Sequence, residues 1–202
     1  MTSWDRIFDR HRPMVENIAT AIASVLQCKH ISKNNGIVPP KELVHRKNCN
    51  RIVIHPAATS PNRWDLQKFV NIATRLQKDG FEVVFCVSSI ERKEWFSLLG
   101  DSFVLPHFPT LAELASFIFE SGYLIGNDSG PGHMASNLQL PTLTIANSAK
   151  RMALWRPGWL EGKVVAPLPF IPNFKGLRLR EKKWKAFIST KRVLNHFYQL
   201  IT

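Results

Sequence analysis

Short apolar runs alternate with amphipathic stretches through the middle of the chain. The apolar runs predict strands at Arg51–His55, Phe81–Val87, Phe103–Leu105, Tyr123–Ile125, Pro141–Ala146 and Lys163–Ala166. The stretches between them predict helices at Asp65–Lys78, Ile90–Leu99, Leu111–Glu120 and Pro131–Leu138, with Asp65 and Thr110 as N-caps. Apolar strands that alternate with helices are typical of a parallel sheet covered on both faces. The pattern therefore predicts an α/β fold, a Rossmann-like doubly wound parallel sheet.

The two flanks of this segment follow a different pattern. Before it, an amphipathic helix is predicted at Pro13–Gln27, followed by a polar, irregular stretch. After it, a loop rich in proline and glycine covers 167–179, and a second amphipathic helix is predicted at Glu181–Leu200. The apolar face of this last helix needs a partner, which is either the sheet or a second body. We therefore divide the chain into residues 1–49, 50–166 and 167–202.

Polar loops follow three of the predicted strands, at 55–64, 87–91 and 126–133. Doubly wound sheets bind ligands at the carboxyl ends of their strands, so we expect these loops to share one edge of the sheet. The third loop reads Gly126-Asn-Asp-Ser-Gly-Pro-Gly-His133 and leads into a helix. Asp128 or Ser129 is expected to cap that helix, and Pro131 suits its first turn.

This third loop has the properties of an anion site. Unpaired N–H groups and the dipole at a helix start favour phosphate, and glycine lets a ligand approach the backbone closely. The pattern predicts a phosphate site at the start of this helix, with His133 in the first helical turn beside the ligand. An ordinary strand-turn-helix connection is the alternative.

The other two loops carry residues that suit the rest of a nucleotide. Thr59 and Ser60 offer hydroxyl groups to phosphate oxygens, and the guanidinium of Arg63 can clamp them. Glu91 lies just past a strand end, where doubly wound folds bind ribose hydroxyls. Both loops also have structural explanations, namely a solvated Arg63 and a Glu91 that favours the helix dipole. His55, at the same edge, is also consistent with a packed histidine.

The net charge of +12 raises the question of a nucleic-acid partner. Its distribution argues against one, because residues 52–149 hold 6 Lys/Arg and 9 Asp/Glu, whereas residues 150–202 hold 12 and 2. A basic tail suits an anionic surface such as phospholipid headgroups, a phosphorylated glycolipid or RNA. A solvated helix face explains the tail equally well.

Several protein classes are excluded by composition and motifs. The 3 cysteines are widely spaced and form neither a disulfide framework nor a zinc set with the 7 histidines, so no metal site is expected. Cys86 lies in an apolar strand and is expected in the core. No Ser/His/Asp order and no GxGxxG fingerprint is present. No apolar run reaches the roughly 18 residues of a membrane span, and the charged N-terminus is unlike a secretory signal. A reducing cytoplasm fits best.

Together the three loops resemble those of one known family. The chain combines His55-Pro-Ala-Ala-Thr59 with Arg63-Trp64, a strand followed by Glu91, and Asn127-Asp-Ser-Gly-Pro-Gly-His-Met-Ala135. From about Asn50 to Trp159 it is similar to the lipopolysaccharide heptosyltransferases and their relatives, glycosyltransferase family 9. The resemblance implies the two-domain GT-B architecture, of which this chain would be the C-terminal, donor-binding half. It also implies an inverting transfer from ADP-heptose to the lipopolysaccharide inner core, with no bound metal and no cofactor besides the donor substrate.

The resemblance also implies roles for individual residues. Asp128 would contact the donor sugar, His133 would face the sugar or phosphate, and Glu91 would hold the ribose. The diphosphate would lie on the N–H groups of Ser129 and Gly130. The resemblance also implies that Thr59 and the backbone near Ala57 and Ala58 line the phosphate site. Ser60 and Arg63 are candidates from the chemistry of the loop itself, and Arg63 would act with Asp128 and His133 in catalysis. The protein would work in the cytoplasm or at the inner face of the membrane.

Two departures from the family pattern change the expected activity. Family members often carry a lysine where this chain has Asn62, and arginine does not simply replace lysine opposite a diphosphate. A whole acceptor-binding domain usually precedes the segment that begins near Asn50, and residues 1–49 are interpreted as its tail and the interdomain linker. The leading hypothesis is therefore a donor-binding half that is incomplete as a catalyst. The alternatives are a non-catalytic remnant or accessory subunit that docks on a separate acceptor-domain polypeptide, and, least favoured, a basic nucleic-acid-binding protein.

Overall fold

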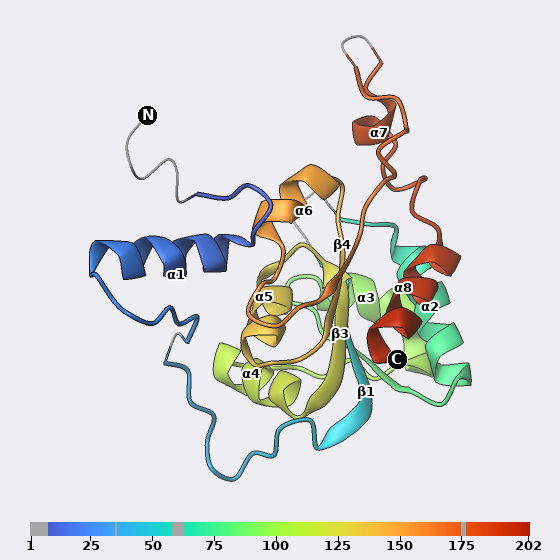
Figure 1. Cartoon of the computed structure of the whole chain (residues 1–202). Helices are drawn as coiled ribbons and strands as arrows, with labels where there is room; N and C mark the ends of the chain where they lie inside the picture. Colours follow the sequence, from blue (N-terminus) through green and yellow to red (C-terminus); the bar gives the residue numbers. More distant parts are fainter. Residues whose placement is uncertain (1–7, 35, 58–62, 175–176) are drawn as a thin grey trace.

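The computed structural model describes residues 8–34, 36–57, 63–174 and 177–202, and Figure 1 shows its path. Within these ranges the centre is a five-stranded sheet of β1 (Asn48–His55), β2 (Glu82–Phe85), β3 (Ser121–Asn127), β4 (Thr142–Ile145) and β5 (Lys163–Val165). The strands lie in the order β2-β1-β3-β4-β5, and every neighbouring pair is parallel. The predicted α/β parallel sheet is confirmed.

Helices connect and flank these strands. They are α1 (Met14–Val25), α2 (Leu66–Lys78), α3 (Arg92–Leu99), α4 (Leu111–Phe119), α5 (Gly130–Asn137), α6 (Ala149–Trp155), α7 (Leu179–Lys182) and α8 (Thr190–Ile201), with a 3-10 turn η2 (Gly100–Ser102) after α3. The expected caps of α2 and α4 are confirmed. The Asp65 carboxylate accepts from the Lys68 N–H at 3.2 Å, and the Thr110 hydroxyl accepts from the Glu113 N–H at 3.2 Å.

The core has two layers because successive strand residues point to opposite faces of the sheet. Ile52 and Ile54 of β1 join one apolar cluster, which includes side chains of α2, α3 and α8. Val53, between them, joins the other cluster, which α4 and α5 cover. Figure 1 shows α2 and α8 together on one side of the sheet and α4 and α5 on the other. Cys86 is buried in the second cluster, as expected from the sequence.

The C-terminal flank corrects the prediction of one helix at Glu181–Leu200. The chain forms the short α7, turns through residues 183–188, and only then begins α8. Ser189 causes this second start, since its hydroxyl accepts from the Arg192 N–H at 3.2 Å. Val193 and Phe197 of α8 are fully buried against the sheet. The partner that the sequence left open is therefore this sheet.

Two further details differ from the predicted pattern. The expected strand at Phe103–Leu105 forms only a single parallel bridge between Val104 and Val84. The turn η2 precedes this segment and Pro106, which has no N–H to donate, ends it. The helix α6 was not predicted, because seven residues between two loops give too short a periodic signal.

The N-terminal flank extends away from the sheet. Helix α1 confirms the prediction at Pro13–Gln27 with slightly shorter bounds, and Figure 1 shows it standing off the body of the molecule. Its contact with the rest includes Gly158, where an added Cβ would lie only 2.4 Å from Pro13. Across the described ranges, no helix is both long and apolar enough to span a bilayer.

Candidate functional site

The carboxyl ends of β1, β2 and β3 bring the predicted loops to one edge of the sheet. An open pocket there is lined by residues from all three loops: His55, Ala57, Glu91, Asp128, Ser129, Gly130 and Pro131. Parallel strand direction causes this arrangement, since every loop that follows a strand emerges at the same edge. Glu91 and the start of α5 are thus neighbours in space although far apart in sequence.

Asn127 ties two of these loops together, a role that the motif alone did not reveal. Its side chain is 2% exposed. Its Oδ1 accepts from the backbone N–H of Trp64 at 3.1 Å, and its Nδ2 donates to the carbonyl of Pro56. The asparagine of the motif therefore anchors both ends of the loop at 55–64 to the turn that starts α5.

The start of α5 is open to a ligand. Ser129 is its N-cap residue. The expected side-chain cap by Asp128 or Ser129 is wrong, because neither side chain accepts a hydrogen bond from the helix. The Ser129 hydroxyl instead donates to the Asn127 carbonyl at 3.1 Å. The first N–H groups of a helix find no acceptor within the helix itself. In α5, Pro131 has no N–H, and the N–H groups of Gly132 and His133 donate to the Ser129 carbonyl at 3.2 and 3.4 Å. The N–H of Gly130 is the one in this first turn that can bind an anion or solvent at the pocket.

The glycines of this turn have different reasons to be glycine. A Cβ on Gly126 would lie 2.5 Å from the carbonyl oxygen of His55, so this residue is required for the close pairing of β1 and β3. A Cβ on Gly132 would meet Pro157 at an ordinary 3.8 Å. A Cβ on Gly130 would meet no atom within 4 Å. Gly130 is thus the position in this turn where bare backbone faces open space.

Asp128 lies between the guanidinium of Arg151 and the imidazole of His133. Its Oδ2 is 3.3 Å from Nη2 of Arg151, and its Oδ1 is 3.8 Å from Nε2 of His133. Arg151 belongs to α6, the helix that sequence reasoning missed. Ser148 was the available signal, because its hydroxyl caps α6 by accepting from the backbone N–H of Arg151. Arg151 therefore places a positive charge next to the Asp128 carboxylate of the motif.

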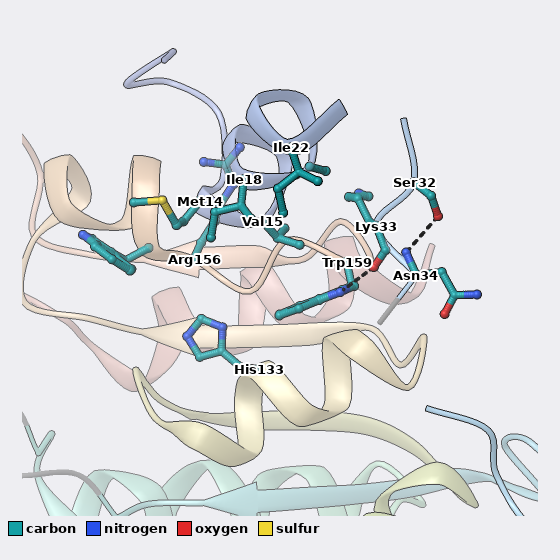
Figure 2. A pocket seen from close by; sticks show the side chains of 12 residues that line it. Met14, Val15, Ile18, Ile22, Ser32, Lys33, Asn34, His133, Arg156 and Trp159 are labelled. Carbon is teal, nitrogen blue, oxygen red and sulfur yellow. Dashed lines mark hydrogen bonds between the residues drawn. The ribbon is translucent and has the colours of Figure 1, made fainter. Parts of the chain in front are cut away.

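His133 borders a second, apolar cavity. This cavity of about 400 Å³ lies between α1 and the body of the molecule, with Ile18 and Ile22 on one side and Trp155 and Trp159 on the other. Figure 2 shows the His133 ring at its edge, and the hydrogen bond from Trp159 Nε1 to the Lys33 carbonyl that closes another side. His133 therefore stands between the polar pocket at Asp128 and an apolar one.

Arg63 is not among the residues that line the polar pocket. Its guanidinium forms a two-pronged ion pair with Glu94 of α3, with distances of 3.2 and 3.3 Å. A phosphate clamp by Arg63 would have to break this pair. Its neighbours Ala58, Thr59, Ser60 and Asn62 lie outside the described residues. Their proposed roles stay predictions.

Glu91 and His55 form the far wall of the pocket. Glu91 is the N-cap residue of α3. Its carboxylate accepts from the Ser88 hydroxyl at 2.7 Å. His55 donates from Nδ1 to the Cys86 carbonyl at 2.7 Å, which leaves Nε2 as an acceptor in the neutral ring. Burial lowers the pKa of His55, against the raising effects of this hydrogen bond and of the Glu91 charge. Among the described side chains, no three His, Cys, Asp or Glu residues come together as a metal site.

Comparison with known proteins identifies the family of this chain. The family model described as glycosyltransferase family 9 (heptosyltransferase) matches residues 6–158. The chain belongs to glycosyltransferase family 9. The match begins well before Asn50, where the resemblance first becomes visible in the motifs, and therefore includes α1.

Individual relatives support the family and the fold. The chain is 31% identical over 125 residues to lipopolysaccharide heptosyltransferase 3 of Escherichia coli K12, a match that covers 54% of this chain and 34% of that protein. The structure of E. coli heptosyltransferase WaaC with ADP superposes with a TM-score of 0.69 at 11% identity, covering 94% of this chain and 58% of WaaC. A family 9 glycosyltransferase from Veillonella parvula gives a TM-score of 0.68 at 16% identity, covering 96% of this chain and 61% of that one. This family 9 chain thus has the fold expected for half of a GT-B enzyme, and it spans from about a third to three fifths of the length of these relatives.

Proposed function

We propose that this chain binds an ADP-activated sugar, such as ADP-heptose, as the donor-binding part of a family 9 glycosyltransferase. The observation that carries the proposal is the pocket at the sheet edge, which combines Glu91 with the open start of α5. Relatives with the same fold support the choice of ligand, because WaaC has been solved with ADP and with ADP-2-deoxy-2-fluoro heptose.

In this proposal each group in the pocket binds one part of the donor. The diphosphate lies over Gly130, where the helix N–H groups and dipole favour negative charge. Glu91 accepts hydrogen bonds from the ribose hydroxyls. Asp128 contacts the sugar, and Thr59, Ser60 and Arg63 complete the phosphate site. To these we add Arg151, whose guanidinium already lies 3.3 Å from Asp128.

The same groups would assist the departure of ADP. Charge develops on the leaving diphosphate as the bond to the sugar breaks, and fixed N–H donors and cations stabilise it without reorganisation. His133, beside Asp128, would face the sugar or its phosphate. The acceptor, by resemblance the inner core of lipopolysaccharide, and the base that activates it would lie on the part of the enzyme that these 202 residues do not match.

On their own, then, these residues are proposed to bind the donor weakly and to transfer little or no sugar. The second candidate is an accessory role without catalysis. The Arg63–Glu94 ion pair favours it, because Glu94 binds the guanidinium that would otherwise contact the phosphates. Adding a separate acceptor-domain polypeptide distinguishes the two. A split enzyme regains transfer from ADP-heptose in the mixture, whereas an accessory subunit without catalytic function does not.

Calorimetric titration with ADP and ADP-heptose tests the donor site. We expect saturable binding of both ligands, and weaker binding of ADP-heptose by the variant Asp128→Ala. The matched control is Asp101→Ala, which removes an exposed aspartate in η2, away from the pocket. Absence of any heat of binding at millimolar ligand, with the fold intact, would refute the proposal.

A further inference from the structure

The chain leaves the sheet after β5 and forms a projecting segment at residues 168–185, excluding 175–176, which we call the basic hairpin. Figure 1 shows its helix α7 and the chain on either side of it standing away from the sheet. Its last residues return to the body, where Trp184 is buried in the core and the Lys185 carbonyl accepts from the Lys68 ammonium of α2. Because β5 is parallel to the other strands, the segment starts from the same sheet edge that carries the polar pocket. The family match ends at residue 158, before this segment begins.

The described part of the basic hairpin is held together by its own hydrogen bonds. Phe174 and Leu177 exchange backbone N–H···O=C bonds of 3.2 and 3.0 Å. The Asn173 side chain donates to the Glu181 carboxylate at 2.9 Å and accepts from the Glu181 N–H at 3.3 Å. The Arg180 guanidinium donates to the Pro169 carbonyl at 2.7 Å. These bonds join the two arms of the hairpin, so its surface residues keep fixed relative positions.

Large apolar side chains of this hairpin face solvent. Phe170 is 77% exposed and Phe174 is 62% exposed. Leu168 and Leu177 are exposed as well. Single exposed apolar residues are ordinary, but a cluster of them on a projecting element marks an interaction site.

Positive charge surrounds these apolar residues. Arg178, Lys182, Lys183 and Lys185 are all exposed. Glu181 is the only acidic residue after Glu161 in the sequence, and Arg178 pairs with it. Asp65, at the start of α2, lies in the same surface pocket as Lys182, Lys183 and Lys185. The hairpin therefore presents aromatic groups together with an excess of cations over carboxylates.

We propose that the basic hairpin docks this protein on the surface of an anionic phospholipid bilayer. Phe170 and Phe174 insert among the acyl chains near the headgroups, while the lysines and arginines contact the phosphates. This combination supplies the two signals that stable peripheral binding needs, apolar insertion and electrostatic attraction. Docking through the hairpin brings the sheet edge with the polar pocket close to the membrane. The proposal does not depend on what that pocket binds.

Vesicle flotation with the full chain tests this inference without any nucleotide. We expect binding to vesicles of phosphatidylcholine with phosphatidylglycerol, little binding to phosphatidylcholine alone, and a decrease as salt is raised. Joint replacement Phe170→Ser and Phe174→Ser should weaken binding roughly a hundredfold, about tenfold for each inserted ring. Phe96→Ser is the matched control, since Phe96 is an exposed phenylalanine of α3 elsewhere on the surface.

A second set of variants tests the charge separately. Lys182→Gln, Lys183→Gln and Lys185→Gln together should weaken binding roughly a hundredfold, about fivefold for each lysine. The control with equal change of net charge is Lys41→Gln, Lys78→Gln and Lys93→Gln, all at exposed positions, and should retain most of the binding. Thermal melting verifies that each variant is folded.

Three outcomes would overturn the inference. One is the absence of vesicle binding by the wild-type chain at low salt. Another is equal loss of binding in the hairpin and control variants, which would indicate attraction by net charge alone. The third is tight binding to single-stranded RNA that survives Phe170→Ser and Phe174→Ser while vesicles are ignored, which would assign the cations to nucleic acid.

Discussion

Removal of the Asn127 side chain should cost this protein both stability and ligand binding. The variant Asn127→Ala deprives the buried N–H of Trp64 and the buried carbonyl of Pro56 of their partners. A buried polar group left without a hydrogen bond costs about 1–3 kcal/mol. Two such groups correspond to about 2–6 kcal/mol, and we expect a loss of about 3 kcal/mol in the free energy of unfolding. For a domain of this size that corresponds to a fall in Tm of about 6–12 °C.

Urea denaturation followed by tryptophan fluorescence measures this loss directly. The control Asn71→Ala removes an exposed asparagine from α2 and should change the free energy of unfolding by less than about 0.5 kcal/mol. At temperatures where the variant is still folded, it should bind ADP more weakly than the wild type, because the loop at 55–64 has lost its anchor. A loss below about 1 kcal/mol for Asn127→Ala would refute the role of this residue as the tether between loops.

Three further predictions follow from the glycine, histidine and cysteine residues of the site and core. Gly130→Ala should fold at least as well as the wild type, because alanine favours helix and its Cβ meets no atom within 4 Å. The same Cβ should weaken ADP binding about tenfold in calorimetry, because it covers the bare backbone at the pocket. An equal loss of binding in the control Gly132→Ala would contradict this. The pKa of His55 is lower in the folded state than the ordinary 6.5, so the unfolded chain binds its proton more readily. The contribution of His55 to stability should therefore fall as pH drops below about 6.5, and His55→Gln should flatten that part of the profile of Tm against pH. Burial raises the pKa of Cys86 to about 12. A thiol reagent should therefore modify the exposed Cys28 and Cys49 in the folded chain, and Cys86 only in urea. Rapid reaction of all three thiols in the native state would contradict the buried position of Cys86.

Local patterns were sufficient to predict the elements with strong periodicity. The apolar runs at Arg51–His55 and Pro141–Ala146 and the amphipathic stretch after Asp65 became β1, β4 and α2 with small shifts of their ends. Strand direction then follows from the helical crossovers, and so does the shared edge of the loops. For this reason the neighbourhood of Glu91 and the start of α5 could be predicted without coordinates.

Side-chain partners across long sequence distances could not be predicted in this way. The motif indicates no role for Asn127, because the partners of its side chain lie 63 and 71 positions away in the sequence. The pairing of Arg63 with Glu94 depends on how α3 packs beside the first loop. The break between α7 and α8 likewise depends on competition between a capping serine and an otherwise continuous apolar pattern.

The central claim is that an ADP-sugar lies on the start of α5, and amide chemical shifts during an ADP titration test it most directly. In isotope-labelled protein, millimolar ADP should produce its largest shifts at Ser129 and Gly130, with smaller ones near His55 and Glu91. Amides of α1 and α8 should stay unchanged. Saturation without movement of the Ser129 and Gly130 signals, or shifts confined to α1, would contradict the account.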